Sequence, residues 1–522
     1  MKSTIMDFDL NVNNIFWRIE RLYKEKTIVS RNKNDIEKIT YGDFAKRVRK
    51  LSRFLLEQGV TRESVVGSIA WNTRRHLELY FAVPLIGSVL HTINVRFMPN
   101  EIEYVINFAN DKIVFIDEDL KGITEELKNG VNSRFFIMSN DLDTLIDSFD
   151  PIYSFDNVDE KSGAVMCFTS GTTGHPKGVV YSHRSIFIHS VELLAKDVIG
   201  ISSDDVVMPV VPMFHISAWD LPYAVLMTGA KLVLPGPKPG PEDLAELISK
   251  EKVTVASAAP TVWISFLDYI KREKIDISSL KIAITGGAEP PKGLIKSFKE
   301  MGIRTYHAWG MTETEAITTV NIKDDVEKLS KQGIPMPGIE IGLISPDLTE
   351  LPWDGKSIGE LIIRGAWVTQ EYFNSPEKTF ESIVNVNGKK WFKTGDIAVI
   401  YPDGNIKIVD RAKDLIKSGG EWISSVDLEN AIMSFEPVLE AVVVGIPDEK
   451  WGERPVALVV PKSGYKVKEE DIRNYLMSLN KFPRWWLPDK IIFVNSIPKT
   501  STGKLDKKTV RKNIKEKFNL KS

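Results

Sequence analysis

The stretch from Thr169 to Gly178 limits what this chain can fold into more than any other, because it reads T-S-G-T-T-G-H-P-K-G. The apolar run A-V-M-C-F before it, residues 164–168, predicts a buried strand. The glycines let the backbone turn tightly and approach a ligand closely. Hydroxyl groups, backbone N–H groups and the charge of Lys177 would then face outward. This chemistry at a strand end suits a polyphosphate and predicts a phosphate-binding loop.

The loop matches neither of the two common nucleotide-binding motifs. Counted from Gly171, a Walker loop would need a glycine where Pro176 stands and a serine or threonine where Gly178 stands. The dinucleotide fingerprint G-x-G-x-x-G is also absent from this stretch. The plain alternative is a surface loop with a chance lysine. A stretch so rich in glycine, serine and threonine, directly after an apolar run, argues against that alternative.

The composition narrows the class of protein. The chain of 522 residues is long enough for two to four domains, and its net charge of -2 argues against bulk attraction to nucleic acid or anionic membrane. Its single cysteine, Cys167, excludes an intramolecular disulfide and a multi-cysteine metal site. The N-terminal residues lack an apolar signal region, and the longest near-apolar stretch, residues 80–93, is too short to span a bilayer. We therefore expect a cytoplasmic enzyme.

Helical and strand-like patterns alternate along the first three hundred residues. The predicted helices cover residues 41–58, 76–93, 102–110 and 184–196. The predicted strands cover residues 65–70, 113–117, 231–234, 253–257, 281–285 and 304–307. Such alternation predicts an α/β architecture with parallel sheets.

Three prolines interrupt residues 206–222, at Pro209, Pro212 and Pro222, and exclude a regular strand or helix throughout. Large apolar residues on such an irregular segment could line a pocket for an apolar substrate. Plain core packing explains each of them nearly as well. His215 adds a polar group among them.

Two further polar motifs follow predicted strands. They read T-G-G-A-E-P at residues 285–290 and Y-H-A-W-G-M-T-E-T at residues 306–314. Open α/β sheets bind ligands at such strand ends. Residues 333–410 then alternate in short strands and turns and predict a β-rich subdomain, in which W-F-K-T-G-D places Asp396 just after a glycine turn. An aspartate there can accept hydrogen bonds from both ribose hydroxyls, although a turn-capping role is the plain alternative.

The last hundred residues predict a compact α+β module. Its helices are expected at 425–434 and 469–479 and its strands at 440–445 and 456–460. The final motif, P-K-T-S-T-G-K-L, places Lys504 on a glycine turn. The basic tail after Ile497 is expected to be solvated rather than bound to nucleic acid, because no aromatic residues are interleaved.

Taken in order, these motifs resemble those of the adenylate-forming superfamily, and the resemblance to its acyl-CoA synthetases covers nearly the whole chain. It implies a large N-terminal AMP-binding domain of parallel α/β subdomains, residues 1–410, whose β-rich part spans about 333–410. A small mobile α+β C-terminal domain, residues 411–522, would swing about Lys413.

The resemblance also implies the site residues. Thr312 would hydrogen-bond the α-phosphate, Glu313 and Thr169 would face Mg²⁺, and Lys504 would bridge the acid and the phosphate. Trp309 stands where a tyrosine is common, and an indole offers a larger stacking face. The catalytic set would be Lys504, Thr312, Glu313 and Lys177. The ATP and AMP site would comprise Thr169, Ser170, Gly171, Thr172, Thr173, Gly174, Lys177, Gly287, Ala288, Glu289, His307, Ala308, Trp309, Gly310, Thr312, Asp396, Arg411, Lys413, Trp422 and Lys504.

The other two substrates would lie next to the nucleotide. By the same resemblance, Gly419, Gly420 and Trp451 would line the CoA channel, and His215, Ile216 and Trp219 the acyl site. ATP, a carboxylic acid and CoA would be the small-molecule partners, and a homodimer through the N-terminal region is expected.

The resemblance predicts an acyl-CoA synthetase that converts an aliphatic acid of medium to long chain to acyl-AMP and then to a CoA thioester. Short or hydroxylated acids remain an alternative, because Trp219 and Trp422 could cap a short pocket. A second alternative is an adenylating enzyme with another acceptor. A third is a non-catalytic nucleotide-binding regulator, against which the presence of both Lys504 and Glu313 argues.

Overall fold

The computed structural model describes residues 1–33, 35–127, 129–169, 175–323, 325–419, 421–499 and 505–517. Its first sheet has six strands, in the spatial order β6 (Arg134–Met138), β5 (Asp111–Asp117), β3 (Val65–Ile69), β4 (Val89–Thr92), β7 (Gly163–Phe168) and β8 (Gly178–Ser182). Neighbours run parallel except β7 and β8, which are antiparallel. The predicted phosphate loop therefore connects two adjacent strands of one sheet.

The second sheet has nine strands. Their order is β15 (Ile334–Pro335), β14 (Thr319–Asn321), β13 (Arg304–Trp309), β12 (Ile282–Gly286), β11 (Val255–Ala258), β9 (Val206–Pro209), β10 (Lys231–Leu234), β1 (Thr27–Arg31) and β2 (Ile36–Thr40). The strands from β13 to β1 are parallel, and the edge strands are antiparallel. The predicted motifs at 285–290 and 306–314 thus leave neighbouring parallel strands at the same edge.

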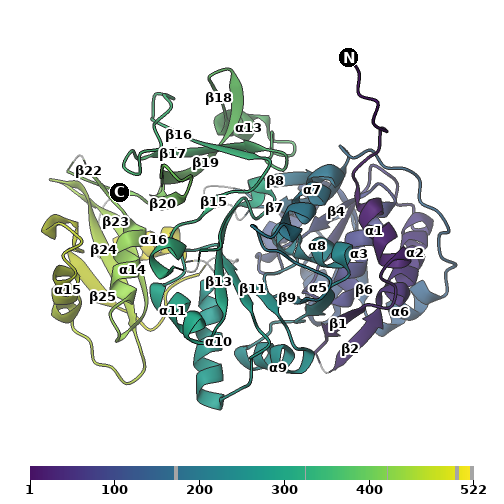
Figure 1. Cartoon of the computed structure of the whole chain (residues 1–522), viewed down its shortest axis with the longest axis horizontal. Coiled ribbons are helices and arrows are strands. Elements are labelled where there is room, and N and C mark those ends of the chain that lie inside the picture. The colour runs from purple at the N-terminus through teal and green to yellow at the C-terminus, as the bar shows by residue number, and fades with distance from the viewer. Residues whose placement is uncertain are drawn as a thin grey trace.

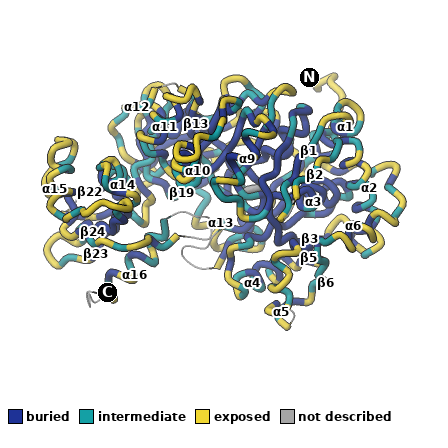
Figure 2. The backbone as a smooth tube through the Cα atoms, turned by 90° about the horizontal axis from the view of Figure 1, so that it is seen from below, coloured by how far each residue is buried: buried dark blue, intermediate teal, exposed yellow. Residues whose placement is uncertain are grey.

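Helices cover these two sheets and fill the space between them (Figure 1). They are α1 (Val12–Arg21), α2 (Tyr41–Glu57), α3 (Arg74–Leu85), α4 (Pro99–Ala109), α5 (Ile123–Leu127), α6 (Asn140–Asp147), α7 (His183–Leu194), α8 (Leu221–Thr228), α9 (Pro241–Glu251), α10 (Pro260–Glu273), α11 (Lys292–Glu300) and α12 (Val326–Leu329). Every residue of α8 from Leu221 to Met227 is buried, and the helix packs on α1 and α7. A helix that is apolar all round belongs inside a core. Figure 2 shows the buried backbone concentrated in these layers.

A β-rich part and a small C-terminal domain complete the chain. The β-rich part contains β16 (Ile339–Ile344), β17 (Gly359–Gly365), α13 (Pro376–Ser382), β18 (Ile383–Val386), β19 (Lys389–Ile400) and β20 (Ile406–Arg411). The C-terminal domain contains β21 (Ile416–Ser418), β22 (Glu421–Ile423), α14 (Ser425–Met433), β23 (Val438–Asp448), β24 (Gly452–Pro461), α15 (Glu469–Ser478), β25 (Lys490–Phe493) and α16 (Lys507–Lys517). Short 3₁₀ helices are η1 (Glu118–Leu120), η2 (Ile216–Asp220), η3 (Thr312–Thr314) and η4 (Arg484–Trp486). The predicted α/β class, with a large N-terminal and a small C-terminal domain, is confirmed.

The predicted helix over residues 76–93 is wrong in its second half. Helix α3 ends at Leu85, with Pro84 in its last turn, and Gly87 takes a positive φ of 76° before β4 begins. A strand buried on both faces of a parallel sheet is continuously apolar, so its pattern cannot be distinguished from that of a buried helix. None of the described helices is long and apolar enough to cross a bilayer.

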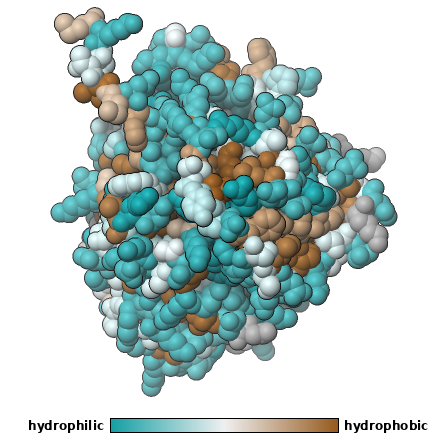
Figure 3. Space-filling view, turned by 90° about the vertical axis from the view of Figure 1, so that its right-hand side faces the viewer, coloured by the Kyte–Doolittle hydropathy of each residue, from teal (hydrophilic) through white to brown (hydrophobic). Residues whose placement is uncertain are grey.

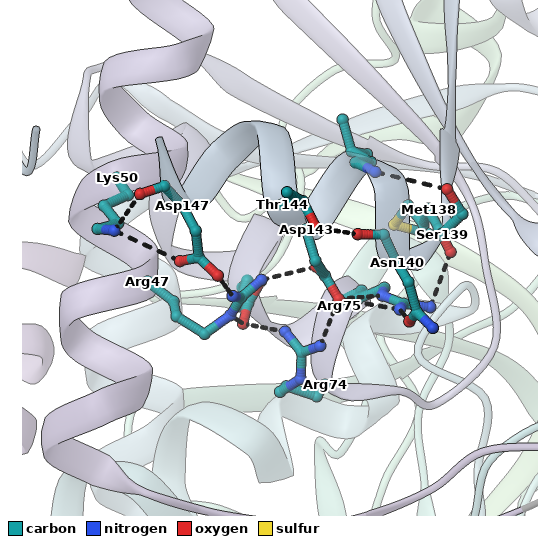
Figure 4. Close-up of polar contacts among 12 residues, drawn as sticks. Arg47, Lys50, Arg74, Arg75, Met138, Ser139, Asn140, Asp143, Thr144 and Asp147 are labelled. Carbon is teal, nitrogen blue, oxygen red and sulfur yellow. Dashed lines mark hydrogen bonds and ion pairs between the residues drawn. The ribbon is translucent and has the colours of Figure 1, made fainter. Parts of the chain in front are cut away.

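An ion-pair network fastens α2, α3 and α6 together near the first sheet (Figure 4). Glu78 is only 2% exposed. Its Oε1 lies 2.6 Å from Arg47 Nε and 2.5 Å from Arg74 Nη1. The same two guanidinium groups contact Asp143, at 2.6 and 2.9 Å. Each buried charge therefore has at least two partners of opposite sign, which is the arrangement that buried charges require.

Candidate active site

The two ends of the phosphate loop meet at its base. The Thr169 N–H donates to the Lys177 carbonyl at 2.9 Å, and the Lys177 N–H donates to Thr169 Oγ1 at 3.2 Å. Thr169 directly follows β7 and Lys177 directly precedes β8, so the hydrogen bonding between the two strands extends one residue pair into the loop. The predicted ligands Ser170, Gly171, Thr172, Thr173 and Gly174 lie outside the described residues.

The T-E motif lies against the strand that follows the phosphate loop. Thr312 and Glu313 are buried in η3, and the Tyr181 hydroxyl of β8 donates to the Thr312 carbonyl at 2.8 Å. Gly310 is required where the chain turns toward them, because a Cβ there would lie 1.3 Å from the Ala316 carbonyl oxygen. Motifs about 140 residues apart in the sequence are thus adjacent in the structure.

Tyr372, which belongs to no predicted motif, joins the two motifs. The Tyr372 hydroxyl donates to Glu313 Oε1 at 2.6 Å and accepts from Lys177 Nζ at 2.9 Å. Burial lowers the pKa of Lys177, and the nearby Glu313 carboxylate opposes that shift. No motif marks Tyr372, and only the fold brings it to the other two residues, from the β-rich part of the chain.

The expected ribose acid, Asp396, lies beside the expected adenine platform. Trp309 Nε1 donates to Asp396 Oδ2 at 2.9 Å, and Arg411 Nε lies 2.6 Å from Asp396 Oδ1. The prediction that Asp396 follows a turn is wrong, since β19 continues through it. Gly395, with a φ of +71°, lies at a β-bulge where the register with β17 shifts. A bulge redirects a side chain without ending the strand. A glycine at a bulge cannot be distinguished by sequence from a glycine in a turn.

Two other predicted nucleotide residues have environments that the sequence did not suggest. His307 is buried, and its Nδ1 lies 2.9 and 3.0 Å from the carbonyls of Leu329 and Lys331. Burial lowers the pKa of His307 to about 4, so the ring is neutral at physiological pH. Burial raises the pKa of Glu289 to about 7, and the nearby Lys407 opposes that shift. The neighbours Gly287 and Ala288 are exposed after β12, and Ala308 pairs with Gly286 in β13.

The candidate acyl residue Trp219 packs against the end of β12. A Cβ placed on Gly286 would lie 3.2 Å from the edge of the Trp219 indole. Ala218, Trp219 and Asp220 all have positive φ values, of 51°, 60° and 54°. Such backbone is costly for residues other than glycine and points to a constrained, functional segment. The Asp220 carboxylate, 2.8 Å from His189 Nδ1, fastens it.

His215 immediately precedes η2, and the side chain of Ile216 lies outside the described set.

The predicted CoA residues meet in the C-terminal domain. The Gly419 N–H donates to the Trp451 carbonyl at 2.8 Å, and a Cβ on Gly419 would lie 3.0 Å from the Trp451 ring. Trp422 and Trp451 are about half exposed, at 45% and 46%. Lys413 lies in the turn between β20 and β21. Gly420 and Lys504 lie outside the described residues.

The oxygen donors of this site suit Mg²⁺, which binds protein and substrate together, better than a metal ion whose ligands all come from the protein. Across the described ranges, no three His, Cys, Asp or Glu side chains gather to hold a metal ion. Mg²⁺ is usually bound by one or two carboxylates together with waters and substrate phosphates. The buried carboxylate of Glu313 and the hydroxyl of Thr169, on adjoining loops, fit that pattern.

Comparison with known proteins agrees with this geometry. The family profile described as AMP-binding enzyme matches residues 16–373, and that of the AMP-binding enzyme C-terminal domain matches residues 427–504. A long-chain-fatty-acid–CoA ligase of Thermus thermophilus is 40% identical over 99% of this chain and 98% of its own length. A 3-methylmercaptopropionyl-CoA ligase of Ruegeria lacuscaerulensis is 36% identical over 99% of both.

A solved structure has the same fold. It is an anthranilate CoA ligase in complex with anthranoyl-AMP, with a TM-score of 0.89, 22% identity and full coverage of both chains. Because the first family profile covers more than half of the sequence and the relatives align along its whole length, the chain belongs to the AMP-binding enzyme family.

Proposed function

We propose that the chain is an AMP-forming fatty acid–CoA ligase that acts on medium to long aliphatic acids. A carboxylate oxygen of the acid would bond to the α-phosphorus of ATP, and pyrophosphate would leave. The CoA thiolate would then bond to the acyl carbon, and AMP would leave. The observation that carries the proposal is one buried hydroxyl that joins Lys177 to Glu313, in a chain whose full-length relatives include CoA ligases.

In this mechanism the chain orients the reactants and offsets their charge, because both nucleophiles arrive on substrates. Lys177 and Thr312 would contact the phosphates, and Lys504 would bridge the acid and the α-phosphate. Glu313 and Thr169 would hold Mg²⁺, which supplies further neutralisation of the phosphate charge. Each such contact typically contributes on the order of 2.7–4 kcal/mol of transition-state stabilisation.

The proposal is tested by acid-dependent AMP release with and without CoA, over carboxylic acids from acetate to hexadecanoate. We expect CoA-dependent release that is fastest with octanoate or longer acids. Faster turnover of acetate or a hydroxybutyrate would contradict the chain-length assignment and support the short-acid alternative. Acid-dependent pyrophosphate exchange without CoA turnover would indicate another acceptor, and nucleotide binding without exchange would indicate a regulator.

Trp219 is proposed to limit the length of the acyl pocket, because its indole fills the space beside Gly286. We expect Trp219→Ala to raise the rate with hexadecanoate relative to hexanoate by at least about tenfold, which is the lower end of the discrimination that one methylene group gives in an apolar pocket. The measurement is kcat/KM for both acids. Trp353→Ala, which removes an exposed indole in the β-rich part, should keep the wild-type ratio. An unchanged ratio in Trp219→Ala would rule out this role.

We also propose that the chain is a cytoplasmic homodimer whose domains divide at residues 410 and 411, with Lys413 as the hinge. In support of a dimer, the N-terminal segment exposes Ile5, Met6, Phe8, Trp17 and Leu22. Apolar groups gather on the face of the molecule shown in Figure 3. Clustered exposed apolar side chains mark interaction surfaces. Sedimentation velocity would measure the mass in solution.

A further inference from the structure

Tyr372 occupies a position between the two loops that are proposed to hold ATP and its metal. Its side chain is 4% exposed, and its hydroxyl lies between Lys177 Nζ and Glu313 Oε1. The hydroxyl has one proton, which it donates to the carboxylate, and lone pairs, with which it accepts from the ammonium group. Lys177 Nζ also lies 4.0 Å from the centre of the ring. The tyrosine therefore links the lysine of the phosphate loop to the glutamate of the T-E motif through one hydroxyl group.

The backbone around Tyr372 is fastened to the same two loops. The Thr369 N–H donates to the Glu313 carbonyl at 2.8 Å, and the Phe373 N–H donates to the Gly178 carbonyl at 2.9 Å. The Tyr372 N–H donates to Thr379 Oγ1 at 2.9 Å, which ties the segment to α13. Residues 369–373 thus bridge the phosphate loop and the T-E motif through both main chain and side chain.

The protonated hydroxyl is the form that this geometry needs. Burial raises the pKa of Tyr372, and the negative charge of Glu313 raises it further, so the proton stays on the phenol. A hydrogen bond to one carboxylate oxygen restrains the rotation of the carboxylate. Groups that hydrogen-bond a metal-binding side chain in this way orient it, and their loss typically lowers metal affinity or activity by about 10–100-fold.

We propose that Tyr372 is a positioning residue for magnesium and polyphosphate: it orients the Glu313 carboxylate toward the cation and holds Lys177 at the phosphates. This inference rests on the proposed function, in that it assumes that the site takes Mg·ATP. In this role Tyr372 acts through Glu313 and Lys177 and does not touch the reacting atoms.

The test compares Tyr372→Phe with the wild type and with Tyr41→Phe. The phenylalanine keeps the ring that packs against Phe392 and loses only the hydroxyl. Tyr41 is a matched control, because its buried hydroxyl donates to the Ala230 carbonyl, away from both loops. Calorimetry would measure the affinity for α,β-methylene-ATP with and without Mg²⁺, and for AMP without Mg²⁺. Initial rates would give the Mg²⁺ concentration for half-maximal AMP release.

In Tyr372→Phe, we expect the affinity for the magnesium complex of the analogue to fall about 10–100-fold and the Mg²⁺ requirement to rise by a similar factor. AMP affinity should stay within about twofold of wild type, which would show that the site is folded. Tyr41→Phe should change none of these values. Equal magnesium-dependent binding in Tyr372→Phe and wild type, with AMP binding intact, would overturn the inference.

A double variant tests whether Tyr372 acts through Glu313. Tyr372→Phe raises the free energy of analogue binding by some amount in the wild type. In a Glu313→Gln background the same substitution should raise it by less than half that amount, because the effects of coupled residues are not additive. A full additive loss would contradict the inference. If the wild type released no AMP with any acid, the proposed function would fail, while the binding comparison would still decide the role of Tyr372.

Discussion

Replacing Glu313 with glutamine is expected to reduce acid-dependent AMP release by about 10²–10³-fold, the typical effect of removing one group that stabilises transition-state charge. The amide has nearly the same shape and can still accept the Tyr372 hydrogen bond, so the loop should keep its structure. The variant loses the negative charge of a buried carboxylate that we propose as the protein's main ligand to Mg²⁺. Initial rates at saturating ATP, over a range of Mg²⁺ concentrations, would measure the loss.

The matched control is Glu327→Gln, which neutralises an exposed glutamate paired with Lys292. It should keep wild-type rates. Chelation of Mg²⁺ should stop AMP release in all three proteins. A Glu313→Gln enzyme with rates within about twofold of wild type would show that the metal ligand is assigned wrongly.

Replacing Glu78 with alanine is expected to destabilise the N-terminal domain by about 3–5 kcal/mol, as is usual when one partner of a buried ion pair is removed. Glu78 is the more buried of the two carboxylates that Arg47 and Arg74 share, so its loss removes one partner from each of two largely buried guanidinium groups. The other shared carboxylate, Asp143, also pairs with Arg75. It therefore cannot fully replace Glu78 as a partner of Arg47 and Arg74. The shift of the urea unfolding midpoint, followed by fluorescence, would measure the destabilisation.

An exposed pair provides the comparison. Glu246→Ala removes the partner of Lys250, four residues away on α9, where both side chains are largely in solvent. Surface pairs of this kind contribute about 0–1 kcal/mol. If Glu78→Ala shifted the midpoint no more than Glu246→Ala does, the network would have no special role in stability.

Local patterns predicted most of the parallel strands, because their apolar runs are bounded by turn residues. They did not predict β1, β6 or β9, and at β4 they predicted a helix, because this strand follows α3 after only three residues and is as apolar as the helix. The order of the motifs predicted which residues would assemble, and the structure does bring Trp309 to Asp396 across 87 residues. It also places Gly419 next to Trp451, to whose carbonyl the Gly419 N–H donates.

Contacts across subdomains could not be predicted from the sequence. Tyr372 stands 195 residues from Lys177, in a segment without glycine or a charged motif to mark it. Its role depends on where residues 369–373 cross the loops, which is a property of tertiary packing alone. The bulge at Gly395 was missed for a related reason, because a glycine before an aspartate has the same appearance in a turn as within a strand.

The ion pair between Asp396 and Arg411 has a thermodynamic consequence. Arg411 ends β20, and the first strand of the C-terminal domain begins at Ile416, so the chain that leads into that domain already occupies one oxygen of the proposed ribose acid. A ribose bound there shares the carboxylate with the interdomain connection. If Asp396 binds ribose as proposed, linkage would require reciprocity: an orientation of the C-terminal domain that weakens the ion pair would change nucleotide affinity, and bound nucleotide would change the preference among orientations by the same free energy.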